Sequence, residues 1–364
     1  MEVLTSRIAI PKAATEGSRF DQVRILADDL TGACDSAAAF LAAGLDVRVW
    51  LGPIAAHDAT EPVQAFNTVS RELAPPDAVK AVSEAAAAIA DQPRILCFKK
   101  VDSAGRGQIA AEVLAAHRVL GTRTVLLAPS FPAAGRTVRG GILQVEDDGG
   151  TRIEVQLILD FQQYGTTSQI GNIGQARQAI ASLATVLVCD ATTQDELEAL
   201  AALDTPDILY AGSAGLAKAL AKVHFGLGKP FAAVLPNVTR PITFSGSLHG
   251  VTNLQMRHLA ETLPQHPAIQ IAGKVGDCPS ILHQFETHNP DALILTGGDT
   301  ALLILQTLGA QSILLRGEMA NGIPWGSIQG GLADGCIVIT KSGGFGTADS
   351  LTRIVRQLLG ENSE

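Results

Sequence analysis

Aromatic residues, cysteines and basic residues are all scarce in this chain of 364 residues. Aromatic residues make up 4% of the sequence. The five cysteines are scattered and form no Cys-x-x-Cys pair, which argues against a disulfide framework and against a zinc knuckle. The chain has 27 Lys and Arg against 36 Asp and Glu, so it lacks the basic excess that nonspecific nucleic-acid binding requires. We therefore expect no nucleic-acid partner.

Long apolar runs are absent as well. No stretch approaches the roughly 18 uninterrupted apolar residues of a membrane helix, so we expect no membrane association. The first twenty residues carry Arg7, Lys12 and Glu16 and no long apolar block, so no secretory signal is visible. These absences together predict a soluble cytoplasmic protein.

The chain does contain abundant glycine and alanine, and short apolar runs that alternate with Ala-rich segments. Glycine accounts for 36 residues, and 46% of the chain is hydrophobic, which excludes general disorder. At roughly 150 residues per domain, the length corresponds to about two domains. The alternation is the βαβα rhythm of an α/β fold.

Hydrophobic periodicity places the expected elements along the chain. It predicts strands at Val23–Ala27, Val47–Leu51, Ile95–Phe98, Thr124–Ala128, Val186–Cys189 and Ile208–Ala211. It predicts helices at Thr31–Leu45, Ala78–Ala90, Gln108–Leu120 and Gln194–Leu203. Residues 140–167 lack a helical period, and we interpret them as a hairpin and loop that extends over a site. The glycines and prolines of 226–240 indicate a linker. The expected division is an extension at 1–22, a first domain at 23–225, the linker at 226–240 and a second domain at 241–364.

Two adjacent acids, Asp28 and Asp29, stand where a predicted strand ends and a helix begins. Open α/β sheets bind their ligands at the carboxyl ends of strands. There, two carboxylates could accept a hydroxyl proton, hold a metal or bind sugar hydroxyls. The alternative is an ordinary helix cap, but one cap would not need both acids.

Charged residues also follow other strands of the first domain. Lys100, Asp102 and Arg106 come after the strand at 95–98, and this combination suits an anionic, hydroxylated substrate. The alternative is a solvated charged loop. Arg71 and Arg136 add two further arginines at candidate loop ends, although a rigid turn with an exposed arginine would also explain Arg136.

Three Gly- and Ser-rich turns follow apolar strands in the second half. Glycines let backbone N–H groups approach an anion, and a helix N-terminus favours negative charge, so the three turns predict a nucleotide polyphosphate site. None matches the Walker pattern, and the dinucleotide fingerprint is absent. Asp299 would repel phosphate, so it fits better beside Mg²⁺ or as a helix cap. The residues predicted to contact the nucleotide are Ser245, Ser247, His249, Gly297, Gly298, Asp299, Thr300, Lys341, Gly343, Gly344, Phe345 and Gly346.

These motifs, taken in order, resemble the four-carbon acid sugar kinases over most of the chain, from Ala27 to about Ile354. The matching pieces are Ala-Asp-Asp-Leu-Thr-Gly-Ala at 27–33, Ser-Arg at 70–71, Lys-Val-Asp-Ser at 100–103, Arg-Gly at 106–107, Pro-x-Phe-Pro-x-x-Gly-Arg-Thr at 129–137, Asp-Ala at 190–191, Gly-Ser-Ala-Gly-Leu-Ala at 212–217, Ser-Gly-Ser at 245–247, Gly-Gly-Asp-Thr at 297–300 and Lys-Ser-Gly-Gly-Phe-Gly at 341–346. The resemblance implies ATP- and Mg²⁺-dependent phosphorylation of a terminal hydroxyl on a small sugar acid such as threonate, erythronate or 3-oxo-tetronate.

The resemblance also implies an architecture and a site. The architecture is two α/β domains, each a mostly parallel sheet flanked by helices, with the active site in the cleft between them. Asp102 or Asp29 is the candidate catalytic base, and the metal ligands stay open. The residues that would line the acid-sugar pocket are Asp28, Asp29, Arg71, Lys100, Asp102 and Arg106, with Arg136 as a further contact.

The sequence departs from the family pattern at three places and leaves two other functions open. His249 stands where serine is common, and the chain is shorter than typical members, with the trimming expected around 140–185. The family usually reads Asp-Ser-Thr-Leu-Arg-Gly, and here Ala104 and Gly105 replace the middle pair. One alternative is an NAD-dependent oxidoreductase of small hydroxy acids, against which the missing dinucleotide fingerprint counts. The other is a catalytically silent sensor of nucleotides or sugar acids. The expected partner is a small sugar acid, and the sequence is compatible with a homo-oligomer.

Overall fold

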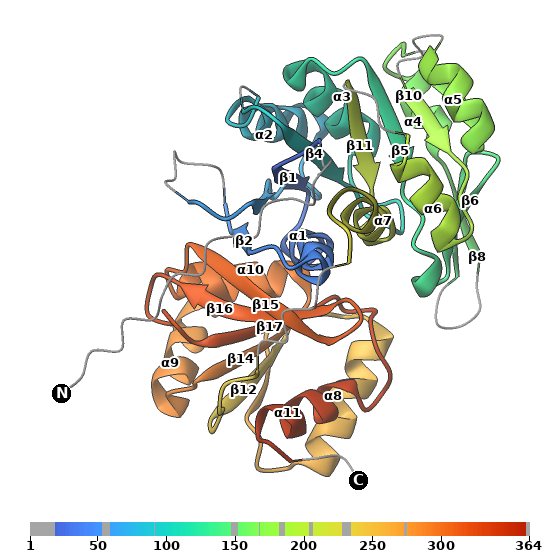
Figure 1. The fold of residues 1–364 in the computed structure, drawn as a ribbon. Helices are drawn as coiled ribbons and strands as arrows, with labels where there is room; N and C mark the ends of the chain where they lie inside the picture. The colour runs from blue at the N-terminus through green and yellow to red at the C-terminus, as the bar shows by residue number, and fades with distance from the viewer. Residues whose placement is uncertain are drawn as a thin grey trace.

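A large mixed sheet with helices on its faces organises the chain (Figure 1). The computed structural model describes residues 19–52, 59–90, 92–146, 152–166, 168–181, 186–203, 207–227, 234–272 and 275–361. Most of the predicted extension at 1–22 lies outside these ranges.

Fourteen strands of the described chain form this sheet. In chain order they are β1 (Gln22–Ala27), β2 (Val47–Trp50), β3 (Val63–Asn67), β4 (Ile95–Lys100), β5 (Thr124–Ala128), β9 (Ser168–Gly171), β10 (Val186–Cys189), β11 (Ile208–Gly212), β12 (Pro241–Ser245), β13 (Ala268–Gln270), β14 (Ala292–Thr296), β15 (Ser312–Ala320), β16 (Ile323–Gln329) and β17 (Ile337–Lys341). The helices are α1 (Leu30–Ala38), α2 (Pro75–Ala87), α3 (Ile109–Leu120), α4 (Leu157–Gln162), α5 (Ile173–Ala181), α6 (Gln194–Ala201), α7 (Ala214–Phe225), α8 (Gly250–Thr262), α9 (Cys278–His288), α10 (Gly298–Thr307) and α11 (Ser350–Leu358). Short 3₁₀ turns lie at Ala39–Ala43, Pro132–Ala134 and Val275–Asp277.

The sheet of the N-terminal half continues into that of the C-terminal half. Its strand order is β13-β12-β14-β17-β16-β15-β2-β3-β1-β4-β11-β5-β10-β9. The junction is the antiparallel pairing of β2 with β15, from Trp50 opposite Ser312 to Val47 opposite Leu315. The expectation of a separate sheet in each domain is therefore wrong. It failed because β2, the last strand of the N-terminal parallel block, pairs its outer backbone groups with β15 rather than leaving an open edge.

The two parallel blocks of this sheet run in opposite directions, because the three pairings that separate them, β2 with β15, β15 with β16 and β16 with β17, are all antiparallel. In a flat sheet, the carboxyl ends of β1 and β14 would lie at opposite edges. Sheets twist by roughly 20–25° per strand pair, and six pairs separate β1 from β14. The accumulated rotation of roughly 120–150° turns the two carboxyl edges toward each other. The helices that follow these strands, α1 and α10, are in contact.

One apolar core extends along a single face of the sheet through both halves. It includes Ala33 and Ala37 of α1, Ala301 and Ile304 of α10, and Ile313 of β15. Helix α1 also contacts β15, β16 and β17, and it lies at the junction of the two halves in Figure 1. The two halves are thus packed through α1 as well as joined through the sheet.

A small antiparallel sheet of three strands leaves the N-terminal half after β5. Its strands are β6 (Arg136–Arg139), β7 (Ile142–Glu146) and β8 (Arg152–Gln156). The hairpin expected within 140–167 is confirmed by β7 and β8. The loop expected after it is wrong in part, because Leu157 and Phe161 bury one face of α4. Val155 of β8 packs against Gly105, so the small sheet covers the loop after β4.

The predicted strands of the N-terminal half all appear in the structure. Several other elements were not predicted, and one predicted helix has a different length. Strand β3 and the elements β9 and α5 were not predicted. The helix expected at 31–45 is an α-helix only to Ala38, after which a 3₁₀ turn ends at Gly44 with φ 79°. Helix α7 ends at Phe225 and β12 begins at Pro241, which are the two ends of the expected linker. Residues 228–233 of that linker lie outside the described residues, and the domain boundaries stay a prediction.

The sequence predicts neither a disulfide framework nor a membrane helix, and the described residues bear on both points. The five cysteines are free thiols. No helix in the described ranges is both long enough and apolar enough to cross a bilayer.

The junction predicts that the two halves unfold together. Ile313 is fully buried in the core that both halves share, so Ile313→Ala should lower the free energy of unfolding by about 2–5 kcal/mol. Trp50 and Trp325 report on β2 and β16, and their fluorescence and the far-UV circular dichroism should share one denaturation midpoint. Ile153→Ala, at a position that is 50% exposed, serves as the matched control and should have little effect. Two separate midpoints would show that the halves are not coupled.

Candidate active site

A buried cluster of one arginine and three carboxylates lies at the carboxyl ends of β1, β3 and β4. Arg71 Nε donates to Asp28 Oδ2 at 2.8 Å, and Arg71 Nη2 donates to Asp28 Oδ1 at 3.0 Å and to Asp29 Oδ1 at 2.7 Å. Asp102 Oδ1 lies 3.6 Å from Arg71 Nη2. These four residues follow three different strands, of which β3 was not predicted, and the parallel pairing of β1 with β3 and β4 brings them together.

The surrounding positive charges keep Asp28 and Asp102 ionised. Burial alone would raise the pKa of Asp28, but Arg71 and Lys100 outweigh burial and hold that pKa below its ordinary value. Burial also opposes ionisation of Asp102, and its hydrogen bonds to Arg106 and the charge of Arg71 hold its pKa well below its usual range. Asp28 and Asp102 therefore offer hydrogen-bond acceptors rather than proton acceptors near neutral pH.

The two lysines at the end of β4, Lys99 and Lys100, lie in different surroundings. Lys99 is fully buried, and its Nζ pairs with Glu112 Oε2 at 2.7 Å, which gives it a structural role. Lys100 Nζ donates to the Val101 carbonyl at 2.7 Å and lies against Gly32, where a Cβ would be 2.9 Å away. Lys100, the predicted site residue, is thus the one beside the start of α1.

The loop after β4 is organised by Asp102. Its Oδ2 accepts the backbone N–H groups of Ala104 at 3.2 Å and Arg106 at 3.1 Å, and Arg106 Nε at 2.9 Å. The Arg106 side chain is 64% exposed. Gly105 has φ 81°, and a Cβ there would lie 2.9 Å from Val155, so this turn requires glycine.

Arg136 connects this loop to the C-terminal half. Its Nη1 donates to Ser103 Oγ at 2.6 Å, and its guanidinium lies 5.6 Å from the centre of the Phe345 ring. The ring of Phe131 lies 6.2 Å from the same Phe345 ring. Phe345, predicted as a nucleotide contact, is thus in contact with two residues of the N-terminal half.

The turn after β14 meets the acidic start of α1. A Cβ on Gly298 would lie 2.8 Å from Asp29 Oδ2 and 3.1 Å from Thr31 Oγ1. Asp29 also caps α1, since its Oδ1 accepts Gly32 N at 2.9 Å and its Oδ2 accepts Thr31 Oγ1 at 2.7 Å. The helix-cap interpretation and the functional interpretation of Asp29 are therefore both compatible with the geometry.

The other two glycine turns pack on each other. Gly343 approaches Ser247 so closely that a Cβ would overlap the serine hydroxyl, and Gly344 lies against His249, 3.1 Å from a Cβ to Nε2. Thr252 Oγ1 donates to the Gly343 carbonyl at 2.7 Å. The three turns thus form one continuous surface at the carboxyl ends of β12, β14 and β17.

Lys341 holds one of these turns from within. Its ammonium is buried and donates to the carbonyls of Ser342 at 2.8 Å, Gly343 at 3.4 Å and Phe345 at 3.0 Å. Burial lowers its pKa to about 7. In this structure, Lys341 orders the turn, while the backbone of the turn faces the seam between the halves.

The remaining predicted nucleotide contacts lie around these turns. Thr300 is buried beside Gly246. Ser245 is buried at the end of β12, and Asp299 is exposed in the first turn of α10. Gly346 has φ 88° and ends the turn after β17.

The structure adds residues to this seam that the motifs did not indicate. Thr31 and Asp35 of α1 face the C-terminal half, and Lys218 of α7 hydrogen-bonds to Asn321. Asn321 and Gly322 form the tip of the β15–β16 hairpin. An Asn-Gly pair between two apolar runs is a hairpin signal that the sequence contained. Its contact with α1 and α7 depends on tertiary packing and had no local signal.

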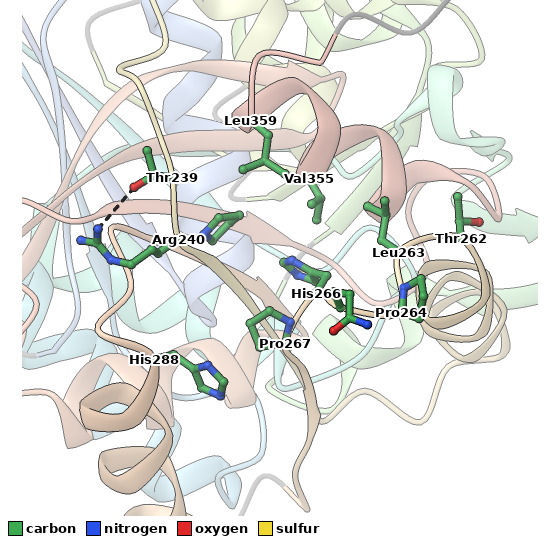
Figure 2. Close-up of a pocket in the computed structure, with 12 residues that line it drawn as sticks. Thr239, Arg240, Thr262, Leu263, Pro264, His266, Pro267, His288, Val355 and Leu359 are labelled. Atoms are coloured by element: carbon green, nitrogen blue, oxygen red, sulfur yellow. Dashed lines mark hydrogen bonds between the residues drawn. The ribbon is translucent and has the colours of Figure 1, made fainter.

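A separate cavity of about 460 Å³ opens at the other end of the C-terminal strands (Figure 2). It lies beside the start of β12, and Arg240, Leu263, His266, Val355 and Leu359 are among the residues that line it. Open α/β sheets bind their substrates at the carboxyl ends of strands, so this cavity is not the candidate active site.

No group of three or more His, Cys, Asp or Glu side chains within the described ranges is arranged to hold a metal ion. Mg²⁺ usually keeps several waters and binds through one or two carboxylates together with substrate phosphates. The carboxylates at the seam are compatible with that mode.

Comparisons with known proteins agree with this division of the chain. A sequence model described as a sugar-binding N-terminal domain matches residues 23–160, and one described as a nucleotide-binding C-terminal domain matches residues 274–351. A D-threonate kinase of Bordetella bronchiseptica is 30% identical over 92% of this chain and 97% of its own length. The chain belongs to the four-carbon acid sugar kinase family. The resemblance drawn from the motifs is thereby confirmed, and the protein is a sugar-acid phosphotransferase.

More distant relatives in the family have other substrates. A D-erythronate kinase of Heliobacterium modesticaldum is 23% identical over 93% of this chain and 97% of its own length. A 3-oxo-tetronate kinase of Brucella melitensis is 24% identical over 89% of this chain and 92% of its own length. A crystal structure from Salmonella typhimurium LT2 matches with TM-score 0.70 at 20% identity and covers 93% of this kinase and 99% of that chain, which shows the shared fold.

Arg71 should dominate the stability of the cluster. Arg71→Met leaves the buried carboxylates of Asp28 and Asp29 without their arginine partner, while Asp102 keeps Arg106, and it should lower the free energy of unfolding by about 3–5 kcal/mol near pH 7. The carboxylates of Asp28 and Asp102 have lowered pKa values, so their stabilisation is present above the unfolded value of about 4 and is lost as the pH falls further. The difference between wild type and variant should therefore narrow in acid.

Denaturant titrations between about pH 2 and pH 8 measure this difference, because the window must extend below the unfolded pKa of these carboxylates. Arg94→Met is the matched control, because Arg94 pairs with Asp21 in an ion pair whose side chains are 54% and 55% exposed. That variant should keep nearly the wild-type stability at every pH. A difference for Arg71→Met that does not depend on pH would contradict the electrostatic explanation.

Proposed function

We propose that the protein transfers the γ-phosphate of ATP to a terminal hydroxyl of a four-carbon sugar acid in the seam between its two halves. D-threonate, D-erythronate and 3-oxo-tetronate are the candidate substrates, because these are the substrates of the related kinases. The contact between Gly298 and Asp29 carries the proposal. It brings the glycine turns of the C-terminal half against the acidic cluster of the N-terminal half, which supports an active site between domains 23–225 and 241–364.

The N-terminal half supplies acceptors and positive charge for the sugar acid. Asp28 and Asp102 are buried and ionised, and a carboxylate accepts hydrogen bonds from sugar hydroxyls. Arg106 and Arg136 would take the substrate carboxylate, since a guanidinium binds carboxylates in a bidentate manner. Lys100 adds a point charge at the start of α1.

The C-terminal half supplies a backbone surface for the triphosphate. Glycines at 297, 298, 343 and 344 add no side chains of their own to these turns, and the N-terminus of α10 favours an anion. The side chains of Asp29, Ser247 and His249 lie against the last three of these glycines. The residues present therefore fit a nucleotide. Mg²⁺ would arrive with the phosphates and neutralise part of their charge.

A phosphoryl-transfer site acts mainly by holding its two substrates in the reactive geometry. Phosphoryl transfer needs the hydroxyl and the γ-phosphate in line, with water excluded. Arg71 fixes Asp28 and Asp29 relative to each other, and Asp102 fixes the loop that carries Arg106. Asp29 and Asp102, predicted as candidate bases, are both paired with arginines. For Asp102, Arg106 and Arg71 stabilise the charged form and weaken it as a proton acceptor.

A coupled assay of ADP release over tetronates and their 3-oxo forms tests the proposed function. We expect turnover with at least one four-carbon acid and much weaker turnover with three- or five-carbon acids, because the hydroxyl must reach the phosphate from a fixed carboxylate. ATP hydrolysis without dependence on any sugar acid, or nucleotide binding without turnover, would instead favour the sensor alternative. Tighter binding of NAD than of ATP would favour the alternative function, an NAD-dependent oxidoreductase.

A single methyl group should weaken the nucleotide site. In Gly343→Ala the new Cβ overlaps the Ser247 hydroxyl, so the turn must shift, and the KM for ATP should rise about tenfold or more. The KM for the sugar acid should change little. Gly250→Ala, at the first residue of α8, is the matched control, because a Cβ there meets nothing within 4 Å. Equal ATP affinity in both variants would remove this turn from the nucleotide site.

A further inference from the structure

One carboxylate at the seam differs from those of the acidic cluster. Asp35 lies on α1, and its Oδ1 is buried yet accepts no hydrogen bond from the described residues. Buried polar atoms are nearly always hydrogen-bonded, because leaving them unpaired costs free energy. Asp28, Asp29 and Asp102 all follow that rule through arginines. Asp35 is the exception, which calls for a functional explanation.

The position of Asp35 places it where the two halves meet. It stands one helical turn after Thr31, so the two side chains share a face of α1. Thr31 lies against Gly298 of the nucleotide half. Asp35 Oδ1 lies against Gly322, at 3.6 Å from the position of a Cβ, and the ring of Phe345 lies against the same glycine. This face of α1 therefore runs from the turn after β14 to the turn after β17.

We propose that Asp35 accepts the proton of the substrate hydroxyl during phosphoryl transfer. The proposal rests on the proposed function. The hydroxyl oxygen forms a bond to the γ-phosphorus, while the bond from that phosphorus to the bridging oxygen of the β-phosphate breaks and its electron pair leaves with ADP. The hydroxyl proton moves to the carboxylate of Asp35 and then to solvent. Asp35 is half-buried as a residue, and its Oδ1 is buried at the seam beside Gly322.

The electrostatics around Asp35 suit a proton acceptor. Burial raises its pKa to about 6. The charges that act on it come from four elements, with Lys100 of β4 and Lys218 of α7 lowering the pKa and Glu318 of β15 and Asp29 at the start of α1 raising it. A general base works best when its pKa lies near the working pH. The ion-paired carboxylates, whose charged forms are stabilised, are weaker bases.

Replacement of the carboxylate tests the role directly. Asp35→Asn should lower kcat by about 10²–10⁴-fold, the range of general-base catalysis, while the KM values for ATP and the sugar acid stay within a few-fold of wild type. Wild-type kcat should fall as the pH drops below about 6, because the carboxylate becomes protonated. That acidic limb should be absent from the residual activity of Asp35→Asn. Asp77→Asn, at an exposed acid in the first turn of α2, is the control and should keep wild-type kcat and pH dependence.

Two neighbouring substitutions keep the proposal testable even where Asp35→Asn folds poorly. Glu318→Gln removes a negative charge but retains the oxygen that accepts Gly322 N, so the acidic limb should move to lower pH. Lys218→Gln removes a positive charge but retains a donor for Asn321, so the limb should move to higher pH. A residue with only a structural role would not produce these opposite shifts.

The outcomes separate this proposal from the proposed function. Wild type that phosphorylates no sugar acid would overturn the proposed function itself. Active wild type together with an Asp35→Asn variant of unchanged kcat, or limbs that do not move in opposite directions in the two neighbouring variants, would overturn the role of Asp35 alone. A loss of kcat with intact binding of both substrates and opposite limb shifts supports it.

Discussion

The pairing of β2 with β15 determines where the glycine turns of the kinase lie relative to the acidic cluster. With the antiparallel pairings of β15, β16 and β17 it sets two parallel blocks in opposite directions within one sheet, and the twist of the sheet then turns their carboxyl edges toward each other. Arg48 adds to this junction, since its Nη1 donates to Ser312 Oγ at 2.8 Å across 264 residues of sequence. A site built from both edges needs this constraint, because loops on independent domains would have no fixed separation.

Charge balance explains why the substrate side of this seam can hold both an acid and hydroxyl groups. Three buried carboxylates at positions 28, 29 and 102 are matched by the cations of Arg71, Lys100 and Arg106. Net repulsion of an anionic substrate is thereby removed, while the ionised oxygens remain as hydroxyl acceptors. Arg71 contacts all three acids and is buried, so it acts as the centre of the cluster and leaves the more exposed Arg106 to meet a ligand.

The sequence named most of the charged residues that the structure brings to the seam and much less of the architecture. Asp28 and Asp102 could be grouped because each follows a predicted strand, and parallel strands place their carboxyl ends at one edge. Arg71 was only a candidate loop end, because β3 was not predicted. The joint sheet could not be predicted, because Val47–Trp50 and Ser312–Leu315 give no local sign of pairing across so long a separation. The loop predicted after the hairpin within 140–167 was wrong in part for a related reason. The amphipathic turn at Leu157 and Phe161 is too short for a helical period to show.

Asp35 shows how a functional residue can be missed inside a correctly predicted helix. The apolar periodicity of Ala33 and Ala37 indicates one packed face of this helix and carries no information on whether Asp35 is buried. A surface helix of a globular protein has one packed face and one polar face exposed to solvent. Helix α1 packs on the core with Ala33 and Ala37 and faces the other half of the kinase with Thr31 and Asp35. A helix packed between two halves of a protein has no face exposed to solvent. A buried acid on such a helix either pairs with another group or has a functional role that offsets the cost of its burial.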